Sequence, residues 1–186
     1  MDKLYLDANQ LLDDSFELGF RILDSGFRPD LLLAIWRGGT PVAIAIQELL
    51  NYHRIPHHHF PIRTRHYSGI DHRRDEVLVD GLDHALALAE APRQVLIVDD
   101  VHDTGLSIAK VIADLEHWFG PDRPEVRVAT PYFKPGKNLT GRVPDFYLHA
   151  TDRWIVFPHE LAGLETGEII ARKTSTPALA RHMKKP

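Results

Sequence analysis

The sequence predicts an α/β fold, and three observations support this prediction. Residues 31–50 and 95–119 each read as an apolar strand, a glycine-containing turn and an amphipathic helix. The strand segments are continuously apolar, which is typical of parallel strands covered on both faces. Apolar residues make up 44% and charged residues 26% of the chain, as in average globular proteins. We therefore expect a central, mostly parallel sheet flanked by helices.

The first elements follow from spacing and from glycine and proline. Residues 8–25 are expected to form a helix, because apolar side chains recur there at helical intervals. Gly26 and Pro29 then end it. Residues 31–36, LLLAIW, form a continuous apolar run of strand length. We expect this strand to lie in the core.

The next two helices each start after a glycine turn. Thr40 is the expected N-cap of a helix over residues 41–50, which has a proline in its first turn. A strand over 95–98 leads to a helix that presents apolar side chains on one face and ends at Gly120. The remaining strands are expected at residues 57–63, 126–133 and 145–150.

Two segments do not show this pattern of strand, turn and helix. Residues 63–81 are dense in charge and are expected to form a mobile loop or a β-ribbon. Residues 135–165 are rich in proline and glycine, and we expect an irregular hood over the sheet edge. The basic tail, residues 172–186, either frays or packs as a last helix. No linker is evident, so residues 1–186 are expected to form a single domain.

Composition and charge exclude several classes of protein. The net charge of −4 gives no field that would draw the chain onto nucleic acid. The absence of cysteine excludes disulfides, thiolate zinc sites and cysteine nucleophiles. No run approaches the roughly 18 apolar residues of a membrane span, and the N-terminus lacks a secretory pattern. We expect a cytoplasmic protein.

The segment VLIVDDVHDTGLS, residues 95–107, carries the chemistry. In open α/β sheets, ligands bind at the carboxyl ends of the strands, where this segment turns into a helix. The helix N-terminus together with the hydroxyls of Thr104 and Ser107 suits a monoester phosphate. Asp99 and Asp100 are acceptors for ribose hydroxyls and, through waters, for a magnesium ion.

This segment resembles the phosphoribosyl diphosphate-binding motif of the type I phosphoribosyltransferases. Residues 31–49 look like the diphosphate-binding loop and following helix of the bacterial xanthine-guanine enzymes. The segments YFKP, residues 132–135, and DRWIVFPHE, residues 152–160, are similar to the purine-binding lysine and hood of the same 6-oxopurine branch. The resemblance implies the type I phosphoribosyltransferase fold and a magnesium-dependent enzyme of purine salvage.

The resemblance also implies roles for single residues. Arg37, Gly38 and Gly39 would hold diphosphate, and the Trp36–Arg37 peptide is a candidate for the cis geometry. The catalytic carboxylates would be Asp99 and Asp100 at the ribose and Asp103 beside N7 of the base. The 5′-phosphate would be bound by Asp103, Thr104, Gly105, Leu106 and Ser107.

The base and the metal have their own implied residues. Lys134 would donate to the 6-oxo group, while Trp154 and Ile155 would pack on the purine. The segment of Arg65, His66, Tyr67 and Ser68 would close over the reaction. Magnesium would lie at Asp99 and Asp100. After the hood proline, Pro158, the family carries tryptophan and then aspartate, whereas this chain has His159 and Glu160. Glu160 is therefore a further candidate ligand.

Other functions remain open from the sequence. A strand that ends in two aspartates before a glycine turn also occurs in other doubly wound folds, where the acids bind metal or cap a helix. A non-catalytic regulator that senses phosphoribosyl diphosphate or nucleotide is the alternative from another class, and a transferase for another base is the alternative among enzymes. The choice among hypoxanthine, guanine and xanthine also stays open. The expected partners are phosphoribosyl diphosphate, a purine base and further copies of the chain in a homodimer or homotetramer.

Overall fold

A computed structural model of the chain describes residues 2–67, 76–174 and 176–183. The chain divides into two compact units, one made of Asp14–Asp152 and the other of Met1–Asp13 with Arg153–Pro186. The helices are α1 (Ala8–Asp24), α2 (Gly39–Tyr52), α3 (Leu82–Leu88), α4 (Leu106–Phe119), α5 (Thr166–Arg172) and α6 (Pro177–His182), with 3₁₀ turns η1 (Gly120–Asp122) and η2 (Pro135–Lys137). The strands are β1 (Lys3–Tyr5), β2 (Leu31–Trp36), β3 (His58–Tyr67), β4 (Glu76–Asp80), β5 (Gln94–Val98), β6 (Val101–His102), β7 (Glu125–Phe133), β8 (Phe146–Ala150) and β9 (Trp154–Val156).

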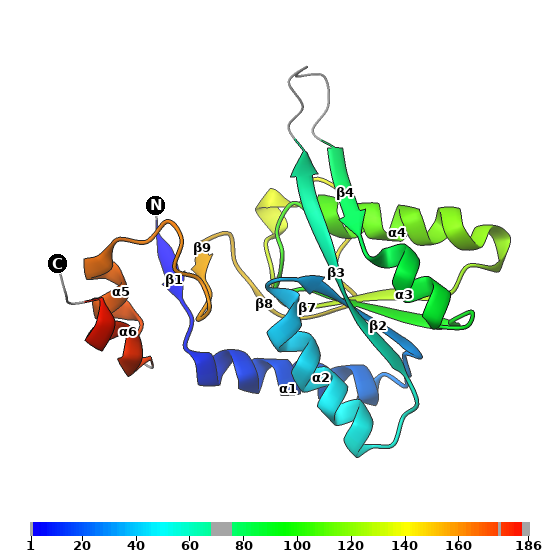
Figure 1. The fold of residues 1–186 in the computed structure, drawn as a ribbon, viewed down its shortest axis with the longest axis horizontal. Coiled ribbons are helices and arrows are strands. Elements are labelled where there is room, and N and C mark those ends of the chain that lie inside the picture. The colour runs from blue at the N-terminus through cyan, green and yellow to red at the C-terminus, as the bar shows by residue number, and fades with distance from the viewer. Residues whose placement is uncertain (1, 68–75, 175, 184–186) are drawn as a thin grey trace. The chain divides into compact units, whose positions relative to one another are not determined.

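The larger unit is built around a mostly parallel sheet (Figure 1). Its strand order is β4-β3-β2-β5-β7-β6, and β8 pairs with the other edge of β7. Only the β3–β4 pair is antiparallel among the strands described here. The α/β class and the mostly parallel sheet are thus confirmed.

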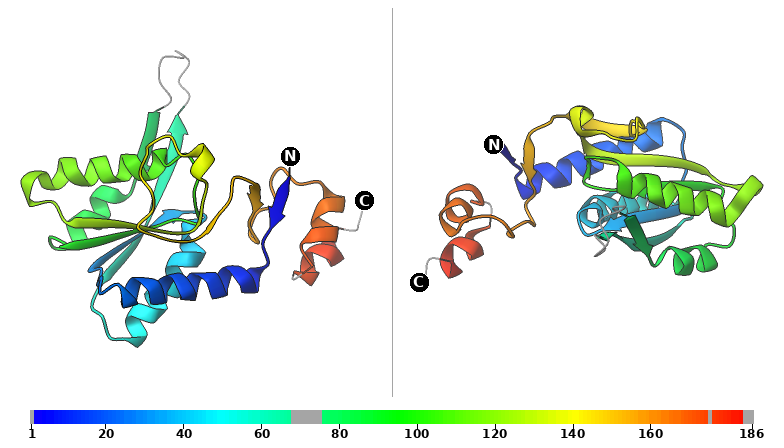
Figure 2. Two further views of the ribbon diagram at one scale, coloured as in Figure 1. Left: turned by 180° about the vertical axis from the view of Figure 1, so that it is seen from behind. Right: turned by 90° about the horizontal axis from the view of Figure 1, so that it is seen from above.

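Helices cover both faces of this sheet (Figure 2). Odd-numbered residues of β2 point to one side and join a core with α3 and α4; its buried members include Leu31, Leu33, Ile62, Val111 and Leu115. The alternate residues Leu32 and Ala34 point to the opposite side, toward α2. On that side α1 packs against α2, since a Cβ on Gly19 would lie 2.5 Å from the Leu49 side chain. Both faces of β2 are therefore covered by helices, which explains its unbroken apolar sequence.

The smaller unit holds the second half of the predicted hood. Its strands β1 and β9 pair in parallel, with Leu4 opposite Ile155. Helices α5 and α6 belong to the same unit. The hood predicted over 135–165 is thus shared between the units: residues 135–152 lie in the larger and 153–165 in the smaller. No helix among the described residues has the length and apolar character required to cross a membrane.

The structure corrects one local prediction and extends others. Thr40 is not the N-cap of α2, because the helix already begins at Gly39 and the Thr40 hydroxyl donates to the Arg37 carbonyl oxygen at 2.6 Å. The segment 63–81 contains a β-ribbon, since β3 extends to Tyr67 and pairs with β4. The tail contains a last short helix, α6, and a further helix, α5, ends where the tail begins. The predicted loop residue Ser68 lies outside the described residues.

Candidate active site

The two predicted phosphate-binding motifs meet at the carboxyl end of the sheet. Strands β2 and β5 are parallel neighbours, with Ala34 opposite Val98, so the turns that follow them lie side by side. A Cβ on Gly38 would lie 2.0 Å from an Asp100 carboxylate oxygen. A Cβ on Gly39 would lie 2.4 Å from the Val98 carbonyl oxygen. A side chain at either position would force a neighbouring group to shift, the Asp100 carboxylate at Gly38 and backbone at Gly39, which explains the Gly-Gly pair.

The turn after β2 has an unusual backbone. The Trp36–Arg37 peptide is cis, in agreement with the geometry that the family resemblance implied. Arg37 is exposed and follows directly on this peptide. The turn therefore offers a guanidinium beside the acidic motif, together with backbone N–H groups at the start of α2.

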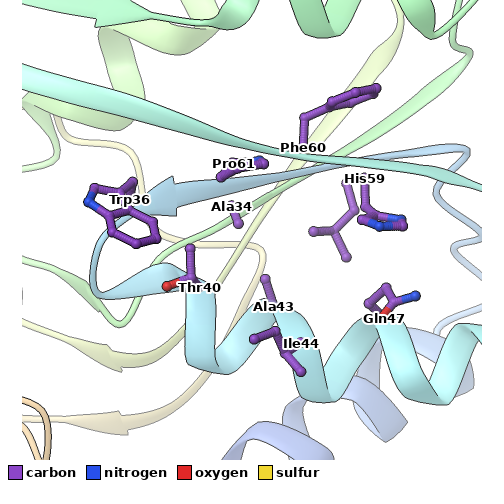
Figure 3. Close-up of a pocket in the computed structure, with 10 residues that line it drawn as sticks. Ala34, Trp36, Thr40, Ala43, Ile44, Gln47, His59, Phe60 and Pro61 are labelled. Atoms are coloured by element: carbon purple, nitrogen blue, oxygen red, sulfur yellow. The ribbon is translucent and has the colours of Figure 1, made fainter.

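The Trp36 side chain lies beside this turn and lines an apolar hollow between α2, β2 and β3 (Figure 3). The hollow measures about 290 Å³ and is lined mainly by carbon, including Ala34, Ile44 and Pro61. It lacks the array of amide and hydroxyl donors that a phosphoryl group requires. We therefore place the candidate active site at the acidic motif and not here.

Asp99 and Asp100 form the turn that connects β5 to β6. The Asp99 backbone N–H donates to the Ala129 carbonyl oxygen at 3.2 Å, which keeps the turn attached to β7. An Asp99 carboxylate oxygen accepts from the Asp100 backbone N–H at 3.0 Å. Burial of Asp99, reinforced by the Asp100 carboxylate, raises the pKa of Asp99 well above its ordinary value. The pair is therefore an unfavourable concentration of negative charge that a cation would relieve.

The residues present fit a magnesium ion that the protein and its substrate would bind together. No group of three or more His, Asp or Glu side chains suited to a metal ion occurs among the described residues. Mg²⁺ is commonly held by one or two carboxylates, with waters and substrate phosphates supplying the other oxygens. Asp99 and Asp100 meet that pattern.

A cavity of about 170 Å³ lies at the N-terminus of α4. Four of the five residues predicted to bind 5′-phosphate line it: Asp103, Thr104, Gly105 and Ser107. Gly105 has a φ of +80°, a left-handed conformation that glycine adopts without strain. The Leu106 N–H points to the Thr104 hydroxyl at 3.4 Å, within the first turn of the helix. Leu106 itself is exposed and does not line the cavity.

Two contacts behind this phosphate loop were not predicted. The Leu139 N–H donates to the Thr104 carbonyl oxygen at 3.0 Å. His102 is 1% exposed, and a Cβ on Gly105 would lie 2.7 Å from both its Nε2 atom and the Thr140 hydroxyl oxygen. His102 also lines the cavity, whereas Leu139 and Thr140 contact the loop without lining it. His102 could have been suspected from its place inside the motif, whereas residues 139 and 140 give no sequence signal.

Lys134 and Asp103 form an ion pair beside the cavity at the N-terminus of α4. The Lys134 Nζ atom lies 2.7 Å from an Asp103 carboxylate oxygen. Lys134 is 4% exposed, whereas the Asp103 side chain is partly open to solvent. Residue 134 follows β7 directly and its N–H donates to the His102 carbonyl oxygen at 2.9 Å. The structure thus brings together two residues that lie in different predicted motifs.

The smaller unit presents the two predicted base-stacking residues on opposite faces of β9. Ile155 is 5% exposed, whereas Trp154 is 48% exposed. Trp154 lines a pocket of about 300 Å³ with Lys3 and Val156. Glu160, the further candidate metal ligand, accepts a hydrogen bond from the Phe157 N–H at 3.2 Å.

Among the predicted loop residues, only the Arg65 side chain is described. It forms an ion pair with Asp80 across the ribbon at 2.7 Å, and this pairing lowers the pKa of Asp80. The backbone of His66 and Tyr67 continues β3, but their side chains lie outside the described residues, as does all of Ser68.

Comparisons with known proteins agree with this geometry. A model of the phosphoribosyl transferase domain family matches residues 3–164. A purine phosphoribosyltransferase from Pyrococcus horikoshii Ot3 has 30% identity and a TM-score of 0.68, over 89% of this chain and 99% of that one. A hypothetical protein from Neisseria gonorrhoeae, solved with bound ppGpp, has 25% identity and a TM-score of 0.66, over 88% of this chain and 92% of that one. The xanthine-guanine-hypoxanthine phosphoribosyltransferase of Helicobacter pylori has 20% identity and a TM-score of 0.59, over 83% and 90%.

Proposed function

The chain belongs to the phosphoribosyl transferase domain family and is a pentosyl-transferring enzyme of the type I fold, and on that premise we propose that its acceptor is a 6-oxopurine. The products would be a purine nucleoside 5′-monophosphate and diphosphate, which is a reaction of purine salvage. The observation that carries this proposal is the Lys134–Asp103 pair beside the phosphate cavity. An ammonium donates but does not accept hydrogen bonds, so Lys134 favours an oxo group over an amine.

The proposed reaction is a substitution at C1 of the ribose. N9 of the base forms the new bond to C1, while the bond from C1 to diphosphate breaks and its electron pair leaves with diphosphate. Asp103 would accept a hydrogen bond from N7–H of the base, or take that proton as positive charge develops. Asp99 and Asp100 would hold the ribose hydroxyls, and Arg37 with the N–H groups of Gly38 and Gly39 would hold the diphosphate.

A bound Mg²⁺ would neutralise negative charge on the diphosphate oxygens. This chain would hold it at Asp99 and Asp100, whose mutual repulsion would fall when the cation binds. Glu160 stays a further candidate for this metal. The N–H groups from Thr104 to Ser107 would fix the 5′-phosphate, so that the sugar presents C1 to the base. The predicted loop residues Arg65, His66, Tyr67 and Ser68 would shield the reaction from water.

The base would also contact the hood, through Ile155 and Trp154. A functional role for both units is supported by the family match, which runs from residue 3 to residue 164 and so includes parts of each. We infer that the whole chain works as one phosphoribosyltransferase domain. Its assembly as a homodimer or homotetramer stays a prediction.

The test is a product assay with phosphoribosyl diphosphate, Mg²⁺ and one base at a time. We expect nucleotide and diphosphate in equal amounts with hypoxanthine, guanine or xanthine, and at least tenfold lower kcat/KM with adenine. Asp103→Asn should lower kcat by about 10²–10⁴-fold, the usual contribution of a positioned acid or base. Equal activity with adenine, or product formed only with a pyrimidine, would show that the acceptor has been assigned wrongly.

A second candidate function is a nucleotide sensor without turnover. It is favoured by the Neisseria gonorrhoeae protein, which was solved with bound ppGpp and is 25% identical. The same assay separates the two: a sensor would bind guanine nucleotides by calorimetry yet release no diphosphate with any base.

A further inference from the structure

The last part of the chain is built into the unit that carries the hood. The family match ends at residue 164, just before α5 and α6. Ile169 of α5 is buried. Glu168 binds the Lys3 ammonium and the Tyr5 hydroxyl, both on β1. Since β1 pairs with β9, this segment is attached to the strand that carries Trp154 and Ile155.

Lys173 makes the most direct contact between this segment and the hood. Its Nζ atom donates to the Phe157 carbonyl oxygen at 2.7 Å and to the Pro158 carbonyl oxygen at 3.3 Å. Lys173 is only 7% exposed. Burial lowers the pKa of Lys173, while the carboxylate of Glu160 opposes that shift. A buried ammonium is tolerated only where acceptors replace its water, and here the acceptors are the carbonyls of the turn after β9.

The same turn is closed from within. The Glu160 N–H donates to the Phe157 carbonyl oxygen at 3.0 Å, and the Glu160 carboxylate accepts from the Phe157 N–H at 3.2 Å. The Phe157 carbonyl therefore accepts from both Glu160 and Lys173. Ordinary exposed lysines contribute nothing comparable, because their charge stays in water.

We propose that Lys173 is a positioning residue for base recognition, which fixes the backbone that follows Trp154 and Ile155 by holding the carbonyls of Phe157 and Pro158. The inference rests on the proposed function, in which the hood contacts the purine. It assigns a role to the segment beyond residue 164, outside the matched family domain. Because Lys173 acts through the turn, its loss changes base binding and leaves the binding of phosphoribosyl diphosphate intact.

The test compares Lys173→Met, which keeps the length and apolar stem, with Lys173→Arg, which keeps the charge and the donors. We expect Lys173→Met to raise KM for the base at least tenfold, with KM for phosphoribosyl diphosphate changed less than twofold. Lys173→Arg should recover KM for the base to within about threefold of the parent. The control is Lys110→Met, which removes a part-exposed ion pair with Asp114 on α4 and should leave both KM values unchanged.

A purely structural role predicts a different result. It would lower Tm and the active fraction of Lys173→Met while both KM values stayed at the parent level, and that outcome overturns the inference. Equal rises in both KM values overturn it as well. If the parent enzyme forms no nucleotide from any base, the proposed function fails on its own, before any variant is compared.

Hydrogen exchange of the full parent chain tests the inference without a variant. It can therefore be used even if Lys173→Met does not fold. Inosine and guanosine 5′-monophosphate serve as probes. We expect either nucleotide to slow exchange at residues 155–160 and 166–173 together. Slowing at 155–160 without slowing at 166–173 would show that the last segment does not support the hood.

Discussion

At the scale of single residues, the proposed recognition of the base depends on a lysine that is buried and ion-paired. Lys134 is buried, and it is held at 2.7 Å by Asp103. The Asp103 carboxylate stabilises the charge of this buried ammonium, and burying an ammonium without such compensation is unfavourable. A base that offers a carbonyl oxygen adds an acceptor without removing Asp103, whereas an exocyclic amine places a second donor against Lys134. The proposed selection for oxopurines would therefore be a consequence of the ion pair and not of pocket size.

Lys134→Gln tests this directly, because an amide can both donate and accept. We expect kcat/KM for the preferred oxopurine to fall about 10–100-fold, as for the loss of a charge-assisted hydrogen bond, while the ratio to adenine shrinks. The measurement is kcat/KM for each base at saturating phosphoribosyl diphosphate. Lys137→Gln, an exposed lysine three residues further on, is the matched control. An unchanged oxopurine-to-adenine ratio in Lys134→Gln would remove Lys134 from base selection.

Tyr132 gives a residue-scale prediction about pH. Burial, together with the Asp14 carboxylate that faces the hydroxyl, raises the pKa of Tyr132 well above its ordinary value. His149 also faces this ring and pairs with Asp14. Above about pH 10 the unfolded tyrosine loses its proton while the folded one keeps it, so the free energy of unfolding falls as pH rises.

Tyr132→Phe removes this titration. In urea unfolding between pH 8 and pH 11, the parent should lose stability relative to the variant, by at most about 1.4 kcal/mol per pH unit above pH 10. Below pH 9 the difference should be constant, because Tyr132 is then protonated in both states. Curves that stay parallel up to pH 11 would contradict the raised pKa.

At the scale of elements, the strand–turn–helix units could be predicted because their signals are local. The strand expected over 95–98 is Gln94–Val98, and the helix that follows ends at Phe119 as expected from Gly120. Helix α3 was missed, since its seven residues are too short for a clear helical period. The β1–β9 pair was missed because it joins segments about 150 residues apart, and neither strand exceeds three residues.

The candidate site divides in the same way. The meeting of the two glycine turns follows from adjacent parallel strands, which a sequence can suggest. The Lys134–Asp103 contact and the contact of Lys173 with the turn after β9 join elements that are distant in the sequence. No spacing of residues in the sequence predicts such contacts. The predicted N-cap Thr40 was wrong because the helix starts two residues earlier than expected, at Gly39, and the Thr40 hydroxyl donates to the Arg37 carbonyl oxygen.

The turn between β2 and α2 supplies the element-scale prediction. In Gly38→Ala the new Cβ would lie 2.0 Å from an Asp100 carboxylate oxygen, so the carboxylate or the turn must shift. We expect KM for phosphoribosyl diphosphate to rise at least tenfold, while circular dichroism stays at the parent level. Gly167→Ala is the control, since a Cβ there meets nothing within 4 Å and the backbone is unstrained. Parent-level kinetics in Gly38→Ala would show that the close contact between this turn and Asp100 does not affect the binding of phosphoribosyl diphosphate.

At the scale of the whole molecule, substrate binding and stability are linked. Any ligand that binds only the folded state stabilises it, by about 2.7 kcal/mol at a hundred times its Kd. For a chain of 186 residues this corresponds to a rise in Tm of about 5–10 °C. The size of the rise therefore reports on binding even where no turnover occurs.

Magnesium should control this stabilisation if Asp99 and Asp100 hold the ion. Phosphoribosyl diphosphate with Mg²⁺ should raise Tm by several degrees, and a chelator such as EDTA should abolish most of that rise. In Asp99→Asn and Asp100→Asn the ligand-free proteins should melt no lower than the parent, because each variant removes one of two mutually repelling carboxylates. Both variants should lose the Mg²⁺-dependent rise. A rise that survives EDTA, or that stays intact in both variants, would place the metal elsewhere and leave the acidic pair with the ribose alone.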